Sequence, residues 1–261
     1  MFNALMPKDD GGEAIAHGLP FGPNARQRLD IYGPGSRAFQ PLPVIIFFYG
    51  GSWSSGTRAG YAFLARALAS GGFIVVIPDY RLVPHVVYPA FLQDNAAAVH
   101  WVREHIGPYG GDPDRIILAG HSAGAYNAAM LALDPRWLGE DRRAVKGLIG
   151  LAGPYDFLPF KGPVVESAFP RIARPELTQP VHYAQAGSPP AFLASGDRDH
   201  VVLPANSDAL ALALRHGGAF VERKRYPGVG HVGLVTAIAR PLRGKAPVLA
   251  DMMVFAHKVT S

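Results

Sequence analysis

The sequence contains no cysteine. This absence excludes disulfide scaffolds, thiolate zinc sites, iron–sulfur clusters and catalysis by a thiol. Charged residues are also few, at 17% of the 261 residues, whereas 49% are hydrophobic, which is a balance typical of a folded chain. The 30 glycines and 24 prolines stay below the share found in low-complexity disorder. A chain of this length and composition can bury a large core without covalent staples.

Long apolar runs are lacking as well. The longest strand-like run, residues 44–49, is far shorter than the roughly 20 residues of a membrane-spanning helix, so we expect no membrane span. The first sixteen residues carry Lys8, Asp9, Asp10 and Glu13 where a signal peptide has its apolar centre. We therefore expect a cytoplasmic protein, or a periplasmic or secreted one if a leader has been removed.

Basic residues exceed acidic ones only modestly, 25 to 20, which gives a net charge of +5. A nucleic-acid surface needs basic residues that cluster on one face. Here they are scattered, and the densest cluster, residues 223–225, lies within an alternating strand pattern. That cluster is typical of a sheet edge or a solvated face, so we expect no nucleic-acid partner.

Short apolar strands alternate with helical patterns along the chain. The predicted strands are 28–32, 44–49, 73–77, 115–119, 145–151, 191–195 and 220–226, and the predicted helices are 58–70, 90–106, 122–133, 204–216 and 246–258. This alternation predicts an α/β fold, a mostly parallel sheet with helices on both faces. Residues 154–190 interrupt it with eight prolines. We expect one domain over residues 1–261 with a small cap insertion at about 154–190, irregular or in short helices.

The segment 120–124, Gly-His-Ser-Ala-Gly, follows the predicted strand 115–119 and opens an alanine-rich helix. This is the G-x-S-x-G pattern in the strand–turn–helix setting that a nucleophilic serine requires. A tight turn strains the backbone of Ser122 and projects its hydroxyl above the sheet. The glycines let strand and helix approach closely, and the helix N-terminus favours an oxyanion.

These features resemble the α/β-hydrolase superfamily, in particular the esterase/lipase branch with a His-Gly-Gly motif after an early strand. The matching segment here is 49–53, Tyr-Gly-Gly-Ser-Trp. The resemblance implies an oxyanion hole formed by the main-chain N–H groups of Gly51, Ser52 and Ala123. Tyr49 stands where the family usually has histidine, which leaves a role for its side chain open. The N–H donors need only the shape of the loop.

The segment 78–82, Pro-Asp-Tyr-Arg-Leu, also resembles the family. We interpret it as architectural. Asp79 and Arg81 are expected to form a partly buried ion pair or hydrogen-bond network that shapes the loop near the site.

A serine nucleophile needs a base, and the base needs an acid that fixes its tautomer. In this fold the chain order is serine, acid, histidine. After the strand 191–195, the family's acid lies three residues past Gly196, which selects Asp199. Asp197 is the alternative, although it is more typical of a residue that caps the loop or pairs with Arg198.

Ten histidines are candidates for the base. His231 is preferred because it follows the glycine-rich segment 226–230, on a loop that can bring its ring over Ser122. His121 adjoins the serine, but we expect its side chain to point away along the turn. Aspartate and histidine could also bind a metal. Asp197, Asp199 and His200 are too local in sequence for a closed site, so we expect no metal.

The sequence thus predicts a serine hydrolase that cleaves carboxylic esters of small molecules through Ser122, His231 and Asp199, with an acyl-enzyme intermediate and no cofactor. Trp53, Tyr80 and Tyr126 are expected to contact the substrate. Aromatic residues of the insertion should cover the nucleophile and leave a small acyl pocket. Two alternatives remain open: an arylformamidase, because kynurenine formamidases share the Gly-Gly-x-Trp loop, and a non-catalytic binding protein of the same fold. The oligomeric state is not fixed.

Overall fold

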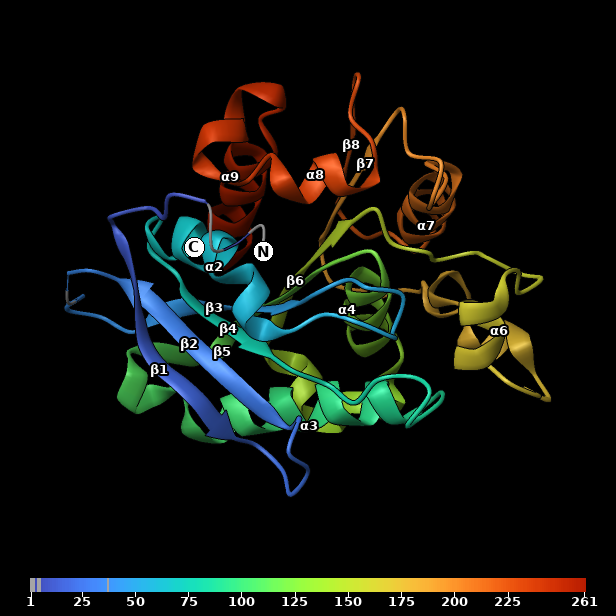
Figure 1. The fold of residues 1–261 in the computed structure, drawn as a ribbon, viewed down its shortest axis with the longest axis horizontal. Helices are drawn as coiled ribbons and strands as arrows, with labels where there is room; N and C mark the ends of the chain where they lie inside the picture. Colours follow the sequence, from blue (N-terminus) through green and yellow to red (C-terminus); the bar gives the residue numbers. More distant parts are fainter. Residues whose placement is uncertain (1–2, 4–5, 37) are drawn as a thin grey trace.

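A computed structural model of the protein describes residues 3, 6–36 and 38–261 (Figure 1). Within these residues, eight strands form one sheet in the order β1-β2-β4-β3-β5-β6-β7-β8. The strands are β1 Gly12–Pro20, β2 Arg28–Pro34, β3 Leu42–Phe48, β4 Ile74–Pro78, β5 Gly111–His121, β6 Val145–Leu151, β7 Ala191–Gly196 and β8 Val221–Tyr226. The pairs β1–β2 and β2–β4 are antiparallel, and every other pair is parallel. The mostly parallel α/β sheet confirms the predicted fold class.

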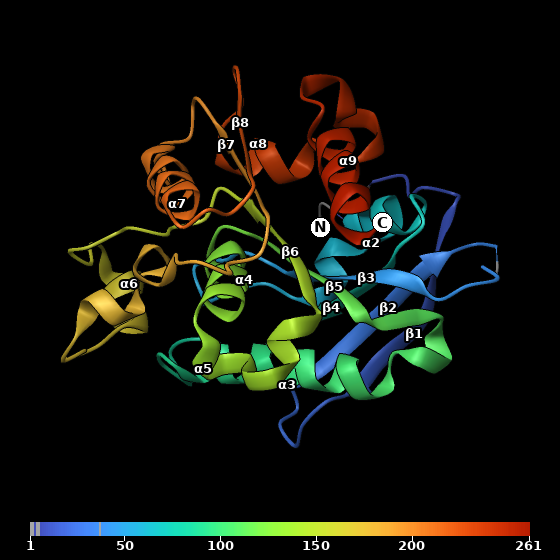
Figure 2. The same cartoon turned by 180° about the vertical axis from the view of Figure 1, so that it is seen from behind.

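Helices cover both faces of the sheet, as the two opposite views show (Figures 1 and 2). One face is covered by α2 and α9, and the other by α3, α4 and α5. The helices are α2 Ala62–Ala69, α3 Ala90–His105, α4 Ala123–Leu133, α5 Pro135–Leu138, α6 Pro163–Ala168, α7 Ala205–His216, α8 His231–Thr236 and α9 Val248–Thr260. In the described part of the chain, none of them is long and apolar enough to cross a membrane.

The central strands and α4 are buried because apolar residues cover them on both sides. Every residue of β4 and every residue of α4 is buried. Continuous apolar runs of this kind are what parallel strands between two helical layers require. The core therefore fixes β5 and α4 rigidly in the middle of the molecule, with the turn between them at the carboxyl ends of the strands.

The strand β1 was not predicted from the sequence, which indicated no helix or strand before residue 28. Its sequence alternates only weakly, and its pairing with β2 shifts register between Ala14 and Ala16 and again between Ala16 and Leu19. It is an edge strand with one row of unpaired main-chain groups. An irregular strand at the edge of a sheet does not require strict alternation of apolar and polar residues. The sequence of β1 therefore lacks the alternation by which a strand is predicted.

The basic cluster at 223–225 lies on β8, the opposite edge of the sheet, as expected for a sheet edge. Arg223 and Arg225 both form ion pairs with Asp208 of α7, and Lys224 pairs with Asp251 of α9. These cations are thus tied to carboxylates of the flanking helices.

The segment 154–190 contains α6 and the 3-10 turns Pro175–Thr178 and Pro180–Tyr183, so the expected short helices are present. Both views show α6 at one end of the molecule, beyond α4 and α7 (Figures 1 and 2). Phe157 and Phe169 of the segment pack against Trp53 and Tyr126, and Phe160 packs against Phe157 and Phe169. The segment is therefore anchored to the main body through a dense cluster of rings.

Candidate active site

The turn between β5 and α4 holds Ser122 in a strained backbone conformation, with a positive φ of 55°. Two glycines make the turn possible. A Cβ on Gly120 would lie 2.3 Å from the main chain of Gly124, and a Cβ on Gly124 would lie 2.0 Å from the carbonyl oxygen of Phe48. The main-chain N–H of Ser122 donates to the carbonyl of Leu151 at 2.9 Å, which ties the turn to the neighbouring strand β6. The surrounding structure therefore enforces the strained backbone conformation of Ser122.

A chain of hydrogen bonds connects Ser122 to a histidine and an aspartate. The Oγ of Ser122 lies 2.8 Å from Nε2 of His231, and Nδ1 of His231 lies 2.8 Å from Oδ2 of Asp199. The other carboxylate oxygen, Oδ1, accepts main-chain N–H groups from Val201 and Val202, each at 2.9 Å. Asp199 is buried and fully oriented by these contacts. The carboxylate therefore fixes His231 with Nδ1 protonated and Nε2 free to accept the serine proton.

The alternative acid, Asp197, lies elsewhere. Its side chain is exposed, and its Oδ1 accepts the main-chain N–H of Gly228 at 2.7 Å. It links the loops after β7 and β8, which agrees with the interpretation of Asp197 as a loop-capping residue.

His231 is the first residue of α8, directly after Gly230, where the sequence indicated a loop. Its neighbour in space is His121, whose side chain does not turn away from the site as expected. The two rings lie 4.8 Å apart, and Nε2 of His121 is 3.1 Å from the carbonyl oxygen of His231. Burial, and secondly the charge of His231, lower the pKa of His121 to about 3. His121 is therefore neutral and donates a hydrogen bond to the main chain of His231.

The loop after β3 lies beside Ser122 and has unusual backbone angles. Gly51, Ser52 and Trp53 all have positive φ, at 122°, 51° and 58°. The indole N–H of Trp53 donates to Oδ1 of Asn127 in α4 at 3.0 Å, which holds one end of the strained loop. Two of the expected oxyanion donors, Ser52 and Ala123, line the same cavity as Ser122, and Gly51 directly precedes Ser52 in the loop. Ala123 also opens α4, where the helix dipole favours negative charge.

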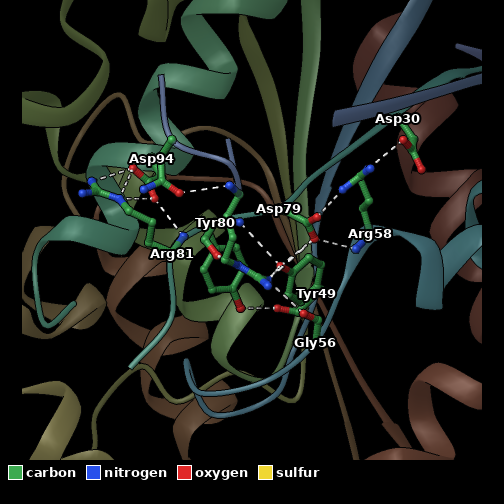
Figure 3. Close-up of polar contacts among 10 residues, drawn as sticks. Asp30, Tyr49, Gly56, Arg58, Asp79, Tyr80, Arg81 and Asp94 are labelled. Atoms are coloured by element: carbon green, nitrogen blue, oxygen red, sulfur yellow. Dashed lines mark hydrogen bonds and ion pairs between the residues drawn. The ribbon is translucent and has the colours of Figure 1, made fainter. Parts of the chain in front are cut away.

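Tyr49 holds the other end of that loop through its hydroxyl group (Figure 3). The hydroxyl donates to Oδ1 of Asp79 at 2.9 Å and accepts from the guanidinium of Arg26 at 2.9 Å. Arg26 also donates to the carbonyl of Gly56, and the Tyr80 hydroxyl donates to the carbonyl of Tyr49 at 2.8 Å. Burial raises the pKa of Tyr49, so its hydroxyl keeps its proton. The loop is thus fixed at residue 49 and again at residue 56.

The expected ion pair between Asp79 and Arg81 is wrong. Asp79 pairs instead with Arg58, whose guanidinium also bridges to Asp30 (Figure 3). Arg81 makes a bidentate contact with the buried carboxylate of Asp94 in α3, at 2.7–3.0 Å. Both residues follow the end of β4 at Pro78, where no strand pairing keeps side chains two positions apart on one side, so the two residues reach partners on different elements. The contacts of Asp79 and of Arg81 both stabilise the segment 78–82, in agreement with its interpretation as architectural.

Ser122 opens into a cavity of about 380 Å³. Besides the turn and loop residues already named, its lining comprises Pro154, residues 156–159, Lys161, Val165, residues 201–203 and Asn206. Trp53 lines the cavity as expected. Tyr80 and Tyr126 do not: both are fully buried, and their hydroxyls donate to the main-chain carbonyls of Tyr49 and Thr178. Their expected contact with substrate is therefore wrong, because the aromatic packing places them behind the wall.

Among the described residues, no group of three or more histidine, aspartate or glutamate side chains is arranged to hold a metal ion.

The fold and the serine–histidine–aspartate geometry together define an α/β-hydrolase of the esterase/lipase branch. The comparison with family models agrees, since the BD-FAE model matches residues 29–214. The chain belongs to the BD-FAE family.

Similar proteins carry esterase names. Esterase LipQ of Mycobacterium tuberculosis (strain ATCC 25618 / H37Rv) is 33% identical, over 90% of this chain and 61% of LipQ. Esterase LipC of the same strain is 30% identical, over 81% of this chain and 58% of LipC. The chain thus spans about three fifths of the length of these curated relatives. Among solved structures, a truncated carbohydrate esterase from gut microbiota has a TM-score of 0.84 at 21% identity, over 98% of this chain and 99% of that one, which supports the fold.

Proposed function

We propose that this protein hydrolyses carboxylic esters, with Ser122 as nucleophile, His231 as general base and acid, and Asp199 as the residue that orients His231. The hydrogen-bond chain from Ser122 to Asp199, with both links at 2.8 Å and its serine end open to a cavity, carries this proposal. The esterase names of its relatives support it.

In the proposed reaction, Oγ of Ser122 attacks the ester carbonyl carbon while its proton moves to Nε2 of His231. The carbonyl oxygen gains negative charge, and the N–H groups of Gly51, Ser52 and Ala123 are the proposed donors to it. His231 then returns the proton to the alcohol oxygen as the carbon–oxygen bond breaks. Water repeats the sequence on the acyl-enzyme and releases the acid. Because donors and base are fixed before substrate arrives, little reorganisation opposes the reaction.

A short acyl group is the finer part of the proposal. Trp53 and Phe157 line the cavity, and the ring centroids of Trp53, Phe157 and Phe169 lie 5.1–6.3 Å apart. In the proposal, this packed group of rings limits the length of the acyl chain. In a series of p-nitrophenyl esters we expect hydrolysis to be greatest between about two and six acyl carbons. A maximum at ten or more carbons would contradict a small acyl pocket.

The test of the activity is the Ser122→Ala variant. It should fold normally, judged by circular dichroism, and lose at least about 10⁴-fold in kcat, because members of such a triad act as a unit. A fluorophosphonate probe should label the wild-type protein at Ser122 and leave the variant unlabelled. N-Formylkynurenine, tested as a substrate beside the esters, distinguishes arylformamidase activity from ester hydrolysis. Turnover close to wild type in Ser122→Ala would disprove the assignment.

A further inference from the structure

Two large aliphatic side chains in the cavity wall are open to solvent. Val201 is 71% exposed and Leu203 is 57% exposed, and both line the cavity that contains Ser122. Leu158, from the segment after β6, lines the same cavity and is 38% exposed. Apolar side chains with nothing packed on them are common singly on a surface, but a group at the mouth of a reaction site is suited to apolar contact.

The place of these exposed aliphatic side chains relative to His231 indicates which part of the substrate they would contact. Nε2 of His231 must give its proton to the alcohol oxygen, so the alcohol leaves on the side of His231. Residues 201–203 belong to the loop that orients the acid, since the N–H groups of Val201 and Val202 bind Asp199. Through Asp199 this loop is linked to the base, and this link favours the leaving-group side as its place.

Another part of the wall differs in character. There the ring cluster of Trp53 and Phe157 is closed by packing, and Trp53 is only 2% exposed. A closed wall limits the length of a group, whereas an open apolar rim accepts a chain of any length that lies along it. The two sides of an ester thus meet different environments.

The geometry points to esters of apolar alkyl alcohols as the substrate class, with a short acyl group inside the cavity and the alkyl chain of the alcohol lying along Val201 and Leu203. This inference rests on the proposed ester hydrolysis and adds which half of the ester carries the apolar chain. Each methylene that moves from water onto the rim lowers the free energy of the bound state and raises kcat/KM.

The test uses acetates of ethyl, butyl and hexyl alcohol, each below its solubility limit so that no interface forms. The acetyl group is constant, so acyl length does not enter. A fully buried methylene corresponds to about fourfold in affinity, and contact with an open rim should give about twofold in kcat/KM per methylene. Hexyl acetate has four more methylenes than ethyl acetate and should therefore exceed it by roughly sixteenfold.

The rim variants are Val201→Ser and Leu203→Ser, which should lower the hexyl-to-ethyl ratio of kcat/KM to about one third or less. Matched controls are Val254→Ser on α9 and Leu212→Ser on α7, whose side chains are 65% and 57% exposed and lie outside the cavity lining. These controls should leave the ratio as in the wild type. Circular dichroism melts check that every variant folds.

The outcomes separate this inference from the activity itself. If ethyl acetate is hydrolysed but kcat/KM does not rise with alcohol length, the alkyl-alcohol class is wrong and ester hydrolysis stands. The class is also wrong if the ratio rises in wild type and the rim variants keep it. If Ser122-dependent hydrolysis of every ester is absent, the proposed function fails first.

Discussion

Ser122 and His121 are adjacent in the chain, yet each serves His231 from a different direction. Ser122 meets the ring at Nε2, and His121 binds the main-chain carbonyl of the same residue. Since its low pKa keeps His121 neutral, its ring adds no positive charge beside His231 when that residue accepts a proton. A charged neighbour there would oppose the protonation on which base catalysis depends.

At the scale of single residues, the two candidate acids can be separated. Asp199→Asn should lower kcat on the order of 10⁴-fold, because an amide no longer holds the required tautomer of His231. Asp197→Asn keeps a side-chain oxygen that can accept the N–H of Gly228, and it should change kcat less than about threefold. Kinetics of the two variants on one p-nitrophenyl ester provide the comparison. A larger loss in Asp197→Asn would contradict the assignment of the acid.

The residues of the hydrogen-bond chain were predictable because local motifs identify them. Ser122 lies in a five-residue pattern, and Asp199 and His231 follow at characteristic places after strands. Contacts between distant segments carry no such signal. The pairing of Arg81 with Asp94 and the binding of Arg26 to Tyr49 depend on how β2, β4 and α3 come together. The burial of Tyr80 behind the cavity wall likewise follows from tertiary packing.

At the scale of elements, the loop 50–57 is the part of the site with the most backbone strain. Three successive residues have positive φ, and two of them, Ser52 and Trp53, are not glycine. Such angles cost on the order of 1–3 kcal/mol each and persist only when neighbours enforce them. Tyr49, just before the loop, and Trp53, within it, supply fixed contacts to Asp79, to α4 and to the segment before β2. The hydroxyl of Tyr49 is thus a positioning group for the proposed oxyanion donors.

Tyr49→Phe tests this role. It keeps the ring, which stacks on Tyr80 at 4.7 Å, but leaves Asp79 and Arg26 each without one hydrogen bond. Unpaired buried polar groups should lower the free energy of unfolding by about 1–3 kcal/mol. A loosened loop should lower kcat about tenfold with KM nearly unchanged, since oxyanion contacts act in the transition state.

Tyr226→Phe is the matched control, because that hydroxyl also donates to a carboxylate, Oδ2 of Asp251, at 2.7 Å. The control should lose stability without a comparable loss in kcat. Thermal melts and steady-state kinetics measure both effects. Equal losses of kcat in the two variants would show that Tyr49 acts only through stability.

At the scale of the whole molecule, sheet and helices were largely predictable because the buried parallel strands are continuous apolar runs. Elements with little burial were not. The edge strand β1 lacked a pattern, and the short helix α8 was expected as a loop. The cap segment 154–190 was recognisable from its prolines, yet the arrangement of its rings around Trp53 depends on contacts across more than one hundred residues.

The two edges of the sheet also bear on how molecules of this protein meet one another. An exposed edge strand offers unpaired main-chain groups to which a strand from another molecule can add. Here β1 is distorted by two shifts of register, and β8 presents Arg223, Lys224 and Arg225 in succession. Asp208 and Asp251 pair with these three cations inside the molecule and neutralise most of their charge. The irregularity of β1 therefore opposes growth of the sheet from molecule to molecule at that border, whereas the paired cations of β8 add little like charge at the other.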